Sequence, residues 1–362
     1  MAAESESGGS APPEVSVIVP ARNEEACLGR CLESLVSQEG VTLEVLVVDD
    51  GSTDRTREIA QGVHGVFVLG ADPLPPGWSG KSNALITGTR HARGGWLLFT
   101  DADTVHLPGS LRRSLQEAKE HGAALLSYSP AQEVHGFWER ALMPVIFAEL
   151  AVTYRPKEVS DPKSKAAAAN GQYLLISREA YEAVGGHAAV AGTLLEDVAL
   201  ARAVKRAGFR LRFRFGGDAV QTRMYRTAGA MWDGWTKNLA ALFPNPLLLA
   251  TARALEFVVL LGGLLAIIAL APRFKEVGIL LAAMAATWLN FSLRIRRAHF
   301  SWDANLSAVA GLPLFALLLV NSFIHYKLRR SVTWKGRSYS ILEEEAGSRK
   351  EAAHERHGLS DA

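Results

Sequence analysis

The sequence feature that most constrains this chain is a short apolar run that ends in two carboxylates, Trp96-Leu97-Leu98-Phe99-Thr100-Asp101-Ala102-Asp103. The run is brief and lies between Gly94-Gly95 and Pro108-Gly109, which favours a buried parallel strand over a helix. Open α/β sheets bind their ligands at strand ends. Because side chains alternate along a strand, Asp101 and Asp103 point the same way and could hold one divalent cation. The competing interpretation of such a pair alone is an Asp-rich turn that caps the next helix.

The chain before this run alternates between strand and helix patterns. Val15–Pro20 and Glu44–Asp49 are β-branched runs, and Glu24–Gln38 between them has the spacing of a helix. This order predicts a β-α-β unit, and right-handed crossovers bring the loop after each strand to one edge of a parallel sheet. Those loops, Pro20–Glu25 and Asp49–Asp54, are polar. Helix capping by Ser or Thr accounts for part of the second loop, but not for two adjacent aspartates before a glycine.

A third strand pattern, Val66–Gly70, is followed by a proline-rich loop that brings Trp78 and Lys81 to the same edge. Lys81 begins the next helix pattern, where the helix dipole disfavours a cation, so it needs an anionic partner. A protein carboxylate and a phosphate both meet that need, and the position of the loop favours the phosphate. The arrangement is neither a Walker loop nor a G-x-G-x-x-G turn, which argues against an ATPase and a dinucleotide enzyme.

Composition and charge limit the remaining possibilities. The chain has 362 residues, 48% of them hydrophobic, and a formal net charge of +2, so its charge gives no reason to expect a nucleic-acid partner. The cysteines, Cys27 and Cys31, lack the histidine partners of a zinc site and predict no disulfide framework. Residues 1–14 contain no apolar segment of the kind found in signal peptides, which predicts a disordered leader and a domain that stays in the cytoplasm.

An ordered series of motifs resembles the nucleotide-sugar half of inverting family 2 glycosyltransferases of GT-A fold. The motifs are residues 17–25 (VIVPARNEE), 49–54 (DDGSTD), 80–84 (GKSNA), 100–103 (TDAD), 170–187 on the acceptor side, and 195–200 (LEDVAL). The resemblance covers about residues 15–240 and implies an α/β sheet that binds a nucleotide sugar and is flanked by helices. Within the family, residues 222–226, 234–238 and 334–339 look most like the carotenoid-type branch, the hydroxychlorobactene and diaponeurosporenoate glycosyltransferases, with hopene-associated glycosyltransferases close by.

The resemblance implies a role for each candidate site residue. The nucleotide sugar would be held by Pro20, Arg22, Asn23, Glu24, Asp50, Lys81 and Asp101. Asp103, helped by Asp101, would bind Mg²⁺ or Mn²⁺ and neutralise the leaving diphosphate. Asp197 would be the base toward the acceptor, and Glu196 would position the acceptor or tune that base. The competing interpretation of these two is an acidic pair favoured at a helix N-terminus. The candidates on the acceptor and diphosphate side are Gly171, Gln172, Arg223, Arg226 and Trp235.

The segment after these motifs bears on the kind of transfer. Processive synthases of the family carry a Gln/Arg-x-x-Arg-Trp signature, whereas this chain has Arg223-x-x-Arg226 followed by Thr227. The missing tryptophan argues against polymer synthesis. We therefore expect one hexose to move from a UDP-hexose such as UDP-glucose to the hydroxyl of a lipid, a terpenoid such as a carotenoid or hopanoid. The alternatives are transfer to polyprenyl phosphate, a less favoured polysaccharide synthase, and a non-catalytic membrane scaffold that binds nucleotide sugar.

Three apolar runs follow the last motif, at residues 247–271, 277–293 and 305–326, and each is of spanning or near-spanning length. Three spans would place the arginines at 294–297 inside, as the positive-inside rule requires, but would leave the basic residues at 327–330 outside. Either Gly311-Leu312-Pro313 breaks the last run into a re-entrant hairpin, or one run does not span. A fourth apolar stretch, residues 137–154, contains charges and a proline, which predicts an amphipathic element lying on the bilayer.

These patterns divide the chain into four parts. They are a disordered leader at 1–14, a glycosyltransferase domain at 15–242, a helical transmembrane region at 243–330 and a polar tail at 331–362. We expect a multi-pass protein of the cell (inner) membrane with its catalytic domain in the cytoplasm. Its expected partners are the nucleotide-sugar donor, the lipid acceptor and the bilayer.

Overall fold

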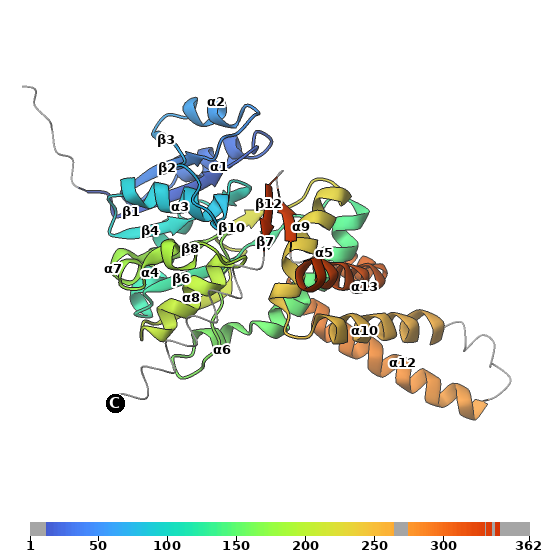
Figure 1. Ribbon diagram of the computed structural model, residues 1–362. Helices are drawn as coiled ribbons and strands as arrows, with labels where there is room; N and C mark the ends of the chain where they lie inside the picture. The colour runs from blue at the N-terminus through green and yellow to red at the C-terminus, as the bar shows by residue number, and fades with distance from the viewer. Residues whose placement is uncertain (1–11, 264–273, 330, 335–336, 341–362) are drawn as a thin grey trace, which may run out of the picture.

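A computed structural model describes residues 12–263, 274–329, 331–334 and 337–340 (Figure 1). The chain forms two parts that lie side by side, a layered α/β part and a helical part (Figure 1). Of the predicted leader and tail, residues 1–11 and 341–362 lie outside the described residues. The predicted first apolar run lies outside them from residue 264 onward.

A sheet of seven strands in the order β3-β2-β1-β4-β8-β6-β9 is the centre of the α/β part. The strands are β1 Val15–Ala21, β2 Leu43–Asp49, β3 Val66–Gly70, β4 Trp96–Phe99, β6 Leu125–Ser129, β8 Leu174–Ser177 and β9 Leu211–Phe215. The first four strands are parallel, as predicted, and β8 is antiparallel to both of its neighbours. The loops after the parallel strands therefore gather at one edge of the sheet.

A second, three-stranded sheet continues from that edge. It contains β5 Thr104–His106, β7 Ala131–Gln132 and β10 Val220–Thr222, in the order β5-β10-β7. β5 begins directly after Asp103 and pairs antiparallel with β10. This pairing turns the chain back immediately after the two carboxylates and so keeps them at the strand-end edge.

Both faces of the large sheet are covered by helices. The helices of the α/β part are α1 Leu28–Val36, α2 Thr56–Gln61, α3 Gly80–His91, α4 Ser110–Glu120, α7 Arg178–Ala183 and α8 Glu196–Arg206. Along β1, Val15 and Val17 belong to a cluster with residues of α1 and α4, whereas Ile18 belongs to another cluster with residues of α3 and α8. A strand buried on both faces reads as a continuous apolar run, which explains the sequence pattern.

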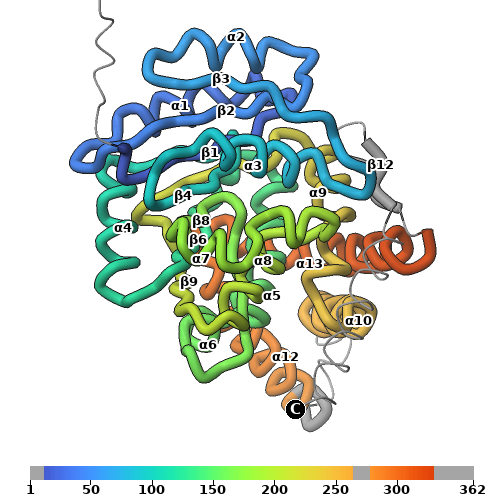
Figure 2. The backbone as a smooth tube through the Cα atoms, turned by 60° about the vertical axis from the view of Figure 1, so that its left-hand side comes forward, coloured from blue at the N-terminus to red at the C-terminus, as the bar shows by residue number. Residues whose placement is uncertain are grey.

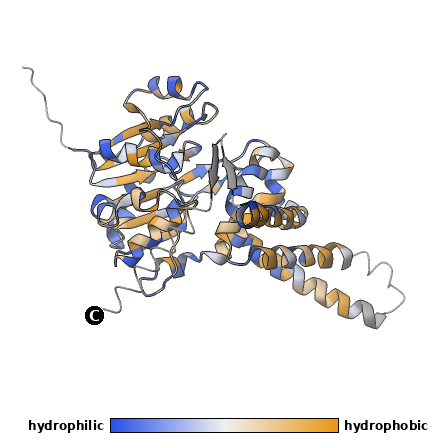
Figure 3. Ribbon diagram, in the orientation of Figure 1, coloured by the Kyte–Doolittle hydropathy of each residue, from blue (hydrophilic) through white to orange (hydrophobic). Residues whose placement is uncertain are grey.

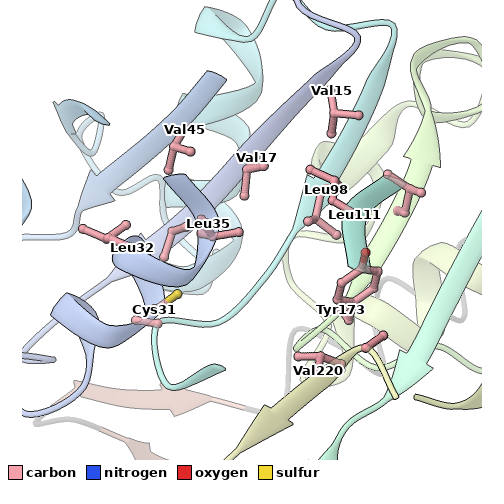
Figure 4. Close-up of a cluster of buried hydrophobic side chains, with 14 of the residues drawn as sticks. Val15, Val17, Cys31, Leu32, Leu35, Val45, Leu98, Leu111, Tyr173 and Val220 are labelled. Atoms are coloured by element: carbon pink, nitrogen blue, oxygen red, sulfur yellow. The ribbon is translucent and has the colours of Figure 1, made fainter. Parts of the chain in front are cut away.

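Figure 4 shows the first of these clusters, in which Cys31 lies beside Leu32 and Leu35. Cys31 is buried and Cys27 is half-buried, and neither forms a disulfide. Cys31 is therefore a core residue of α1, whereas Cys27 lies just before the helix and is outside the cluster.

The helical part contains α5 Phe137–Thr153, α9 Ala228–Leu242, α10 Pro246–Phe257, α12 Phe274–Ile295 and α13 Trp302–Phe323, followed by β11 Ser331–Trp334 and β12 Arg337–Ser340. The short α6 Pro156–Ser160 packs against β9 of the large sheet. π-helical turns extend α10 to Gly262 and α13 to Arg329. Figure 3 shows predominantly hydrophobic residues along α10, α12 and α13. Among the described residues, Gly278–Ala298 and Trp302–Arg329 are each long and apolar enough to cross a membrane, and Ala228–Leu242 with Pro246–Gly262 make a third candidate that is bent by 115°.

The structure excludes one of the two alternatives for the last apolar run and changes the interpretation of residues 137–154. Gly311-Leu312-Pro313 does not break the last apolar run, because α13 continues through Pro313 as one helix. Most apolar side chains of α5 face protein, because Leu142 and Ile146 are buried in one cluster with residues of α13; only Phe137 and Trp138 at its start are large exposed apolar residues. Gly311 lies against the backbone of Ala141, so closely that a Cβ would not fit, and this small residue lets the two helices pack tightly.

Three buried charged side chains and the half-buried Arg253 join α5, α10 and α12. Glu149 Oε1 lies 3.0 Å from Arg253 Nε and 2.9 Å from Arg294 Nε. Glu256 Oε2 lies 2.6 Å from Arg253 Nη1 and 2.7 Å from Arg294 Nη2. Each acid thus contacts both arginines, and the charges of this quartet cancel.

We expect the Arg294→Met variant to be less stable than the wild type. One cation would then serve two buried acids, and an uncompensated buried charge costs about 3–5 kcal/mol. The measurement is the melting temperature of the protein in detergent, with Arg112→Met, at an exposed position, as the control. If both variants melt with the wild type, the quartet does not stabilise the helical part.

Candidate active site

A cavity of about 1280 Å³ opens where the strand-end loops meet the helical part. It is lined by most of the predicted site residues: Pro20, Arg22, Glu24, Asp50, Lys81, Asp101, Asp103, Gly171, Gln172, Glu196, Asp197 and Trp235. Asn23, Arg223 and Arg226 are not among its lining residues. Loops that are distant in sequence therefore meet in one space, at the edge of the sheet where they were expected.

The loops after β1 and β2 are tied together at one end of the cavity. Arg22 Nη1 donates a hydrogen bond to the backbone oxygen of Asp50 at 2.5 Å. Asn23 has a φ of 53°, which is uncommon outside glycine, and its Oδ1 accepts from the backbone N–H of Thr53 at 2.9 Å. Asn23 thus shapes the loop without lining the cavity, whereas Arg22 and Asp50 line it.

Lys81 links two groups of carboxylates in the cavity wall. Its Nζ lies 2.8 Å from Asp101 Oδ1 and 3.1 Å from Glu196 Oε1. Burial alone would lower the pKa of Lys81, but Asp101, Glu196 and Asp197 together hold this pKa well above its usual value. Protein carboxylates are therefore anionic partners of this lysine in the structure, and a phosphate partner stays a prediction.

The two acids at the start of α8 have opposite pKa shifts. Asp197 Oδ2 accepts a hydrogen bond from the backbone N–H of Gly171 at 2.8 Å. Burial, and then the adjacent charge of Glu196, raise the pKa of Asp197 to about 6. Burial also acts to raise the pKa of Glu196, but the positive charges of Lys81 and Lys237 hold the pKa of that carboxyl below its usual value. Asp197 is thus the member of the pair that exchanges a proton closest to neutral pH.

Asp101 and Asp103 both line the cavity just after β4. Carboxylate oxygens are ligands that Mg²⁺ and Mn²⁺ favour. Within the described part of the chain, no group of three or more His, Cys, Asp or Glu side chains is placed to hold an ion. Asp101 is paired with Lys81, so a divalent cation at the two aspartates stays a prediction.

The motifs did not reveal a buried polar network beneath the Asp101 turn. Thr104 Oγ1 donates to the backbone oxygen of Asp101 at 2.8 Å, and Thr100 Oγ1 donates to that of Gln172 at 2.7 Å. His106 Nε2 lies 3.1 Å from the Thr100 hydroxyl oxygen and 3.3 Å from that of Thr104. Because both hydroxyl hydrogens are already donated, Nε2 carries the ring hydrogen. Burial lowers the pKa of His106 to about 3, so the ring is neutral.

The other half of the cavity lies against the helical part and is mainly apolar. It is lined by Phe147, Leu150, Ala151 and Tyr154 near the end of α5, by Leu242 of α9, by Phe213 and Phe215 of β9, and by Arg296, Arg297 and His299 after α12. His299 has a φ of 60°, and its ring stacks on that of Phe215 with centroids 4.2 Å apart. This contact joins the end of α12 to the sheet, so both parts of the chain form this wall.

The two arginines expected to clamp a diphosphate have other partners. Arg223 Nη2 lies 2.8 Å from Glu139 Oε1, and Arg226 Nη2 donates to the backbone oxygen of Ala26 at 3.1 Å. Both line a small adjoining hollow together with Asp103. Arg223 contacts Glu139, and not the main cavity, because a mostly buried carboxylate requires a cation beside it.

Helix α9 contributes more to the cavity than the predicted Trp235. The Trp235 ring is buried in the helical cluster, and its Nε1–H points to Met143 Sδ at 3.4 Å. Lys237 and Asn238 follow it along the cavity wall. Burial lowers the pKa of Lys237, although the acids of the site act in the opposite direction. The Trp-Thr-Lys-Asn sequence at 235–238 was the signal that could have placed this lysine in the site.

Comparison with known proteins agrees with this geometry. Residues 16–185 match the family Glycosyl transferase family 2. Over 347 residues, the chain is 29% identical to the 4,4'-diaponeurosporenoate glycosyltransferase of Staphylococcus aureus (strain USA300), covering 91% of this chain and 89% of that protein.

A solved structure is similar over most of the chain. It is the mannosyltransferase PcManGT from Pyrobaculum calidifontis, in complex with GDP-Man and Mn²⁺, with a TM-score of 0.55 and 18% sequence identity over 89% of each chain. At this identity the likeness shows the fold alone. It confirms the predicted GT-A-like α/β sheet with flanking helices.

We expect the neutral ring of His106 to make stability depend on pH. Below pH 6.5 the unfolded chain binds a proton at this histidine and the folded chain does not, so its contribution is lost as pH falls from 6.5 toward about 3. The difference in unfolding free energy between the wild type and His106→Asn should therefore shrink by up to about 1.4 kcal/mol per pH unit. Urea denaturation in detergent between pH 7 and pH 4 measures it, and a constant difference would contradict a neutral buried ring.

Proposed function

Because this chain is a glycosyltransferase with a family 2 domain at residues 16–185, we propose that it transfers a single hexose from a nucleotide sugar to a membrane lipid, with inversion at the sugar. One observation carries the proposal. A single cavity joins the Asp101 and Asp103 carboxylates to Asp197 and to the apolar residues at the end of α5. A donor site, a base and a lipid-compatible surface are then within reach of one another.

The proposed chemistry needs one base. Asp197 takes the proton of the acceptor hydroxyl while the acceptor oxygen bonds to the anomeric carbon, and the bond from that carbon to the diphosphate breaks. Its raised pKa suits this role near neutral pH. Glu196 stays ionised beside Lys81 and positions the acceptor or tunes Asp197. Mg²⁺ or Mn²⁺ at Asp103 and Asp101, when bound, supplies positive charge to the leaving diphosphate.

We place the nucleotide of a UDP-hexose such as UDP-glucose at the end of the cavity formed by the loops after β1 and β2. Pro20, Arg22, Glu24 and Asp50 line that end. The tie between Arg22 and Asp50 keeps the two loops together, so this surface is formed before a ligand arrives. Asn23 supports it from behind through its bond to Thr53.

The acceptor belongs in the apolar half of the cavity. The Staphylococcus aureus relative is named for 4,4'-diaponeurosporenoate, which supports a terpenoid acceptor of carotenoid type. One observation favours a second candidate, transfer to polyprenyl phosphate. Arg296 and Arg297 line the same half and would pair with an acceptor phosphate.

We propose that the catalytic domain extends over residues 15–242 and faces the cytoplasm, with the helices after it in the cell membrane. Two apolar helices that are long enough to cross a bilayer support this membrane location. The cavity then lies between a cytoplasmic donor and a lipid acceptor.

The Asp197→Asn variant tests the transferase and its base together. Membranes containing the full chain are incubated with radiolabelled UDP-glucose, Mg²⁺ and a terpenoid-alcohol extract, and the organic phase is counted. We expect label in that phase with the wild type and a loss of about 10²–10⁴-fold with the variant, the usual contribution of general-base catalysis. The matched control is Asp233→Asn, an exposed aspartate of α9, which should retain the wild-type rate.

Two outcomes would contradict the proposal. No label in the organic phase with UDP- or GDP-sugars and with either alcohol or polyprenyl phosphate acceptors would leave a scaffold that binds nucleotide sugar. Transfer that is unchanged in Asp197→Asn would show that this carboxylate is not the base, as expected for an acceptor that reacts as a carboxylate and has no proton to lose.

The pH dependence of transfer tests the partnership of Glu196 and Asp197. A base must be ionised, so activity should rise as pH increases through about 6. The charge of Glu196 raises the pKa of Asp197, so the Glu196→Gln variant should move this acidic limb to lower pH, whatever its effect on the maximal rate. The profile of kcat/KM against pH measures it. A limb that stays in place or moves upward would show that Glu196 does not tune Asp197.

A further inference from the structure

The apolar helices of this chain do not all run in one direction. In Figure 1, α10 and α12 are seen from the side and project away from the sheet, whereas α13 is seen nearly along its axis. In Figure 2, turned by 60°, α13 is seen from the side and α10 nearly along its axis. α13 therefore crosses the hairpin of α10 and α12, and the two cannot both lie along the normal of a flat bilayer.

The exposed surfaces of α12 and α13 also differ. The buried share of the apolar window is 17% for Gly278–Ala298 and 44% for Trp302–Arg329. The large exposed apolar residues of α12 are Ile279, Leu281, Trp288, Leu289 and Leu293. At about 100° per residue they cover about half of the helix circumference, as expected for a helix with lipid along one broad side.

α13 exposes only a narrow apolar stripe. Within Trp302–Phe323, its large exposed residues are Trp302, Leu306, Leu317 and Val320, with Trp302 80% exposed. At about 100° per residue they fall within an arc of about 60°. The opposite side is buried in one cluster with residues of α5, α9 and α10. One apolar stripe on a helix that is otherwise covered by protein fits a helix lying in the headgroup region.

The positive charges agree with this difference. Arg296 and Arg297 are exposed after α12, and Lys327 and Arg329 are exposed at the end of the α13 helix. If α13 crossed the bilayer, these two basic pairs would lie on opposite sides, against the positive-inside rule. If only the hairpin of α10 and α12 crosses the bilayer, both basic pairs stay on the same side of the membrane as the sheet.

We propose that α13 lies in the membrane surface with its Trp302–Val320 stripe in the boundary between headgroups and acyl chains, and that only the hairpin of α10 and α12 crosses the bilayer. Glu256 of α10, which pairs with Arg253 and with Arg294 of α12, then marks the end of the hairpin nearest the sheet. This arrangement places the C-terminal end of α13 on the same side as the catalytic cavity.

Spin-label depth measures the proposal directly. Leu306→Cys and Leu317→Cys are labelled separately in the full chain carrying Cys27→Ser and Cys31→Ala, and the protein is reconstituted into phosphatidylcholine–phosphatidylglycerol vesicles. The two positions are about 16 Å apart along the helix. We expect both labels at one shallow depth from their collisions with oxygen and a nickel chelate. The matched pair on α12, Ala286→Cys and Leu293→Cys, about 10 Å apart, should differ, with position 286 deeper.

A second measurement uses the wild-type cysteines, in case the substituted background does not fold. Tags at the two ends of the full chain are digested by protease added outside sealed vesicles. We expect both tags to be cut or both to be protected in the same vesicles. Tags on opposite sides, or a label at position 317 that is about 16 Å deeper than the label at 306, would overturn the proposal. Equal shallow depths at 286 and 293 would overturn the hairpin as the crossing element.

Discussion

The ion pairs of Lys81 are the interaction on which the candidate site depends. One ammonium group neutralises Asp101, from the turn after β4, and Glu196, from the start of α8. Without it, those acids and Asp197 would face one another across a partly buried cavity, where like charges repel strongly. The same contact keeps Glu196 ionised, and the charge of Glu196 is one of the causes of the raised pKa of Asp197. A lysine at an unfavourable end of a helix thus joins the turn after β4 to the start of α8 and influences which of the two acids of α8 has the higher pKa.

Much of the α/β part could be predicted, because its strands are short apolar runs with polar residues at their ends. β1, β2, β3 and β4 appear where those runs lie, and their loops meet at one edge. The helical part was predicted less well. Apolar stretches show that side chains avoid water, but not whether lipid or protein covers them, so the burial of α5 against α13 could not be read from the sequence. Pro313 was an equally ambiguous signal, because a proline is tolerated in a helix whose neighbours compensate for the lost hydrogen bond.

The candidate site shows a similar division. Residues that belong to a local motif after a strand, such as Lys81 and Asp101, came together in the cavity as expected. Arg223 does not line the cavity, because it pairs with Glu139, which is far away in sequence. No local sequence pattern predicts a buried acid that needs a cation. The buried network around His106 could not be predicted for the same reason. The histidine lies on a short strand, and the two hydroxyls beside its ring already donate to other groups. Sequence order thus predicts which groups reach the edge, whereas the pairing of buried polar groups is decided by packing.

The quartet of Glu149, Arg253, Glu256 and Arg294 has a consequence for how the protein sits in the membrane. With the hairpin in the bilayer, charged groups near its base resist being drawn into hydrocarbon, so the depth of insertion is fixed. The cavity then keeps a constant height above the acyl chains. The proposed lipid acceptor would reach Asp197 by raising its polar end through that height, while the remainder of its chain stays in the lipid. The proposed transfer would then depend on the polar end of the acceptor and not on the length of its tail.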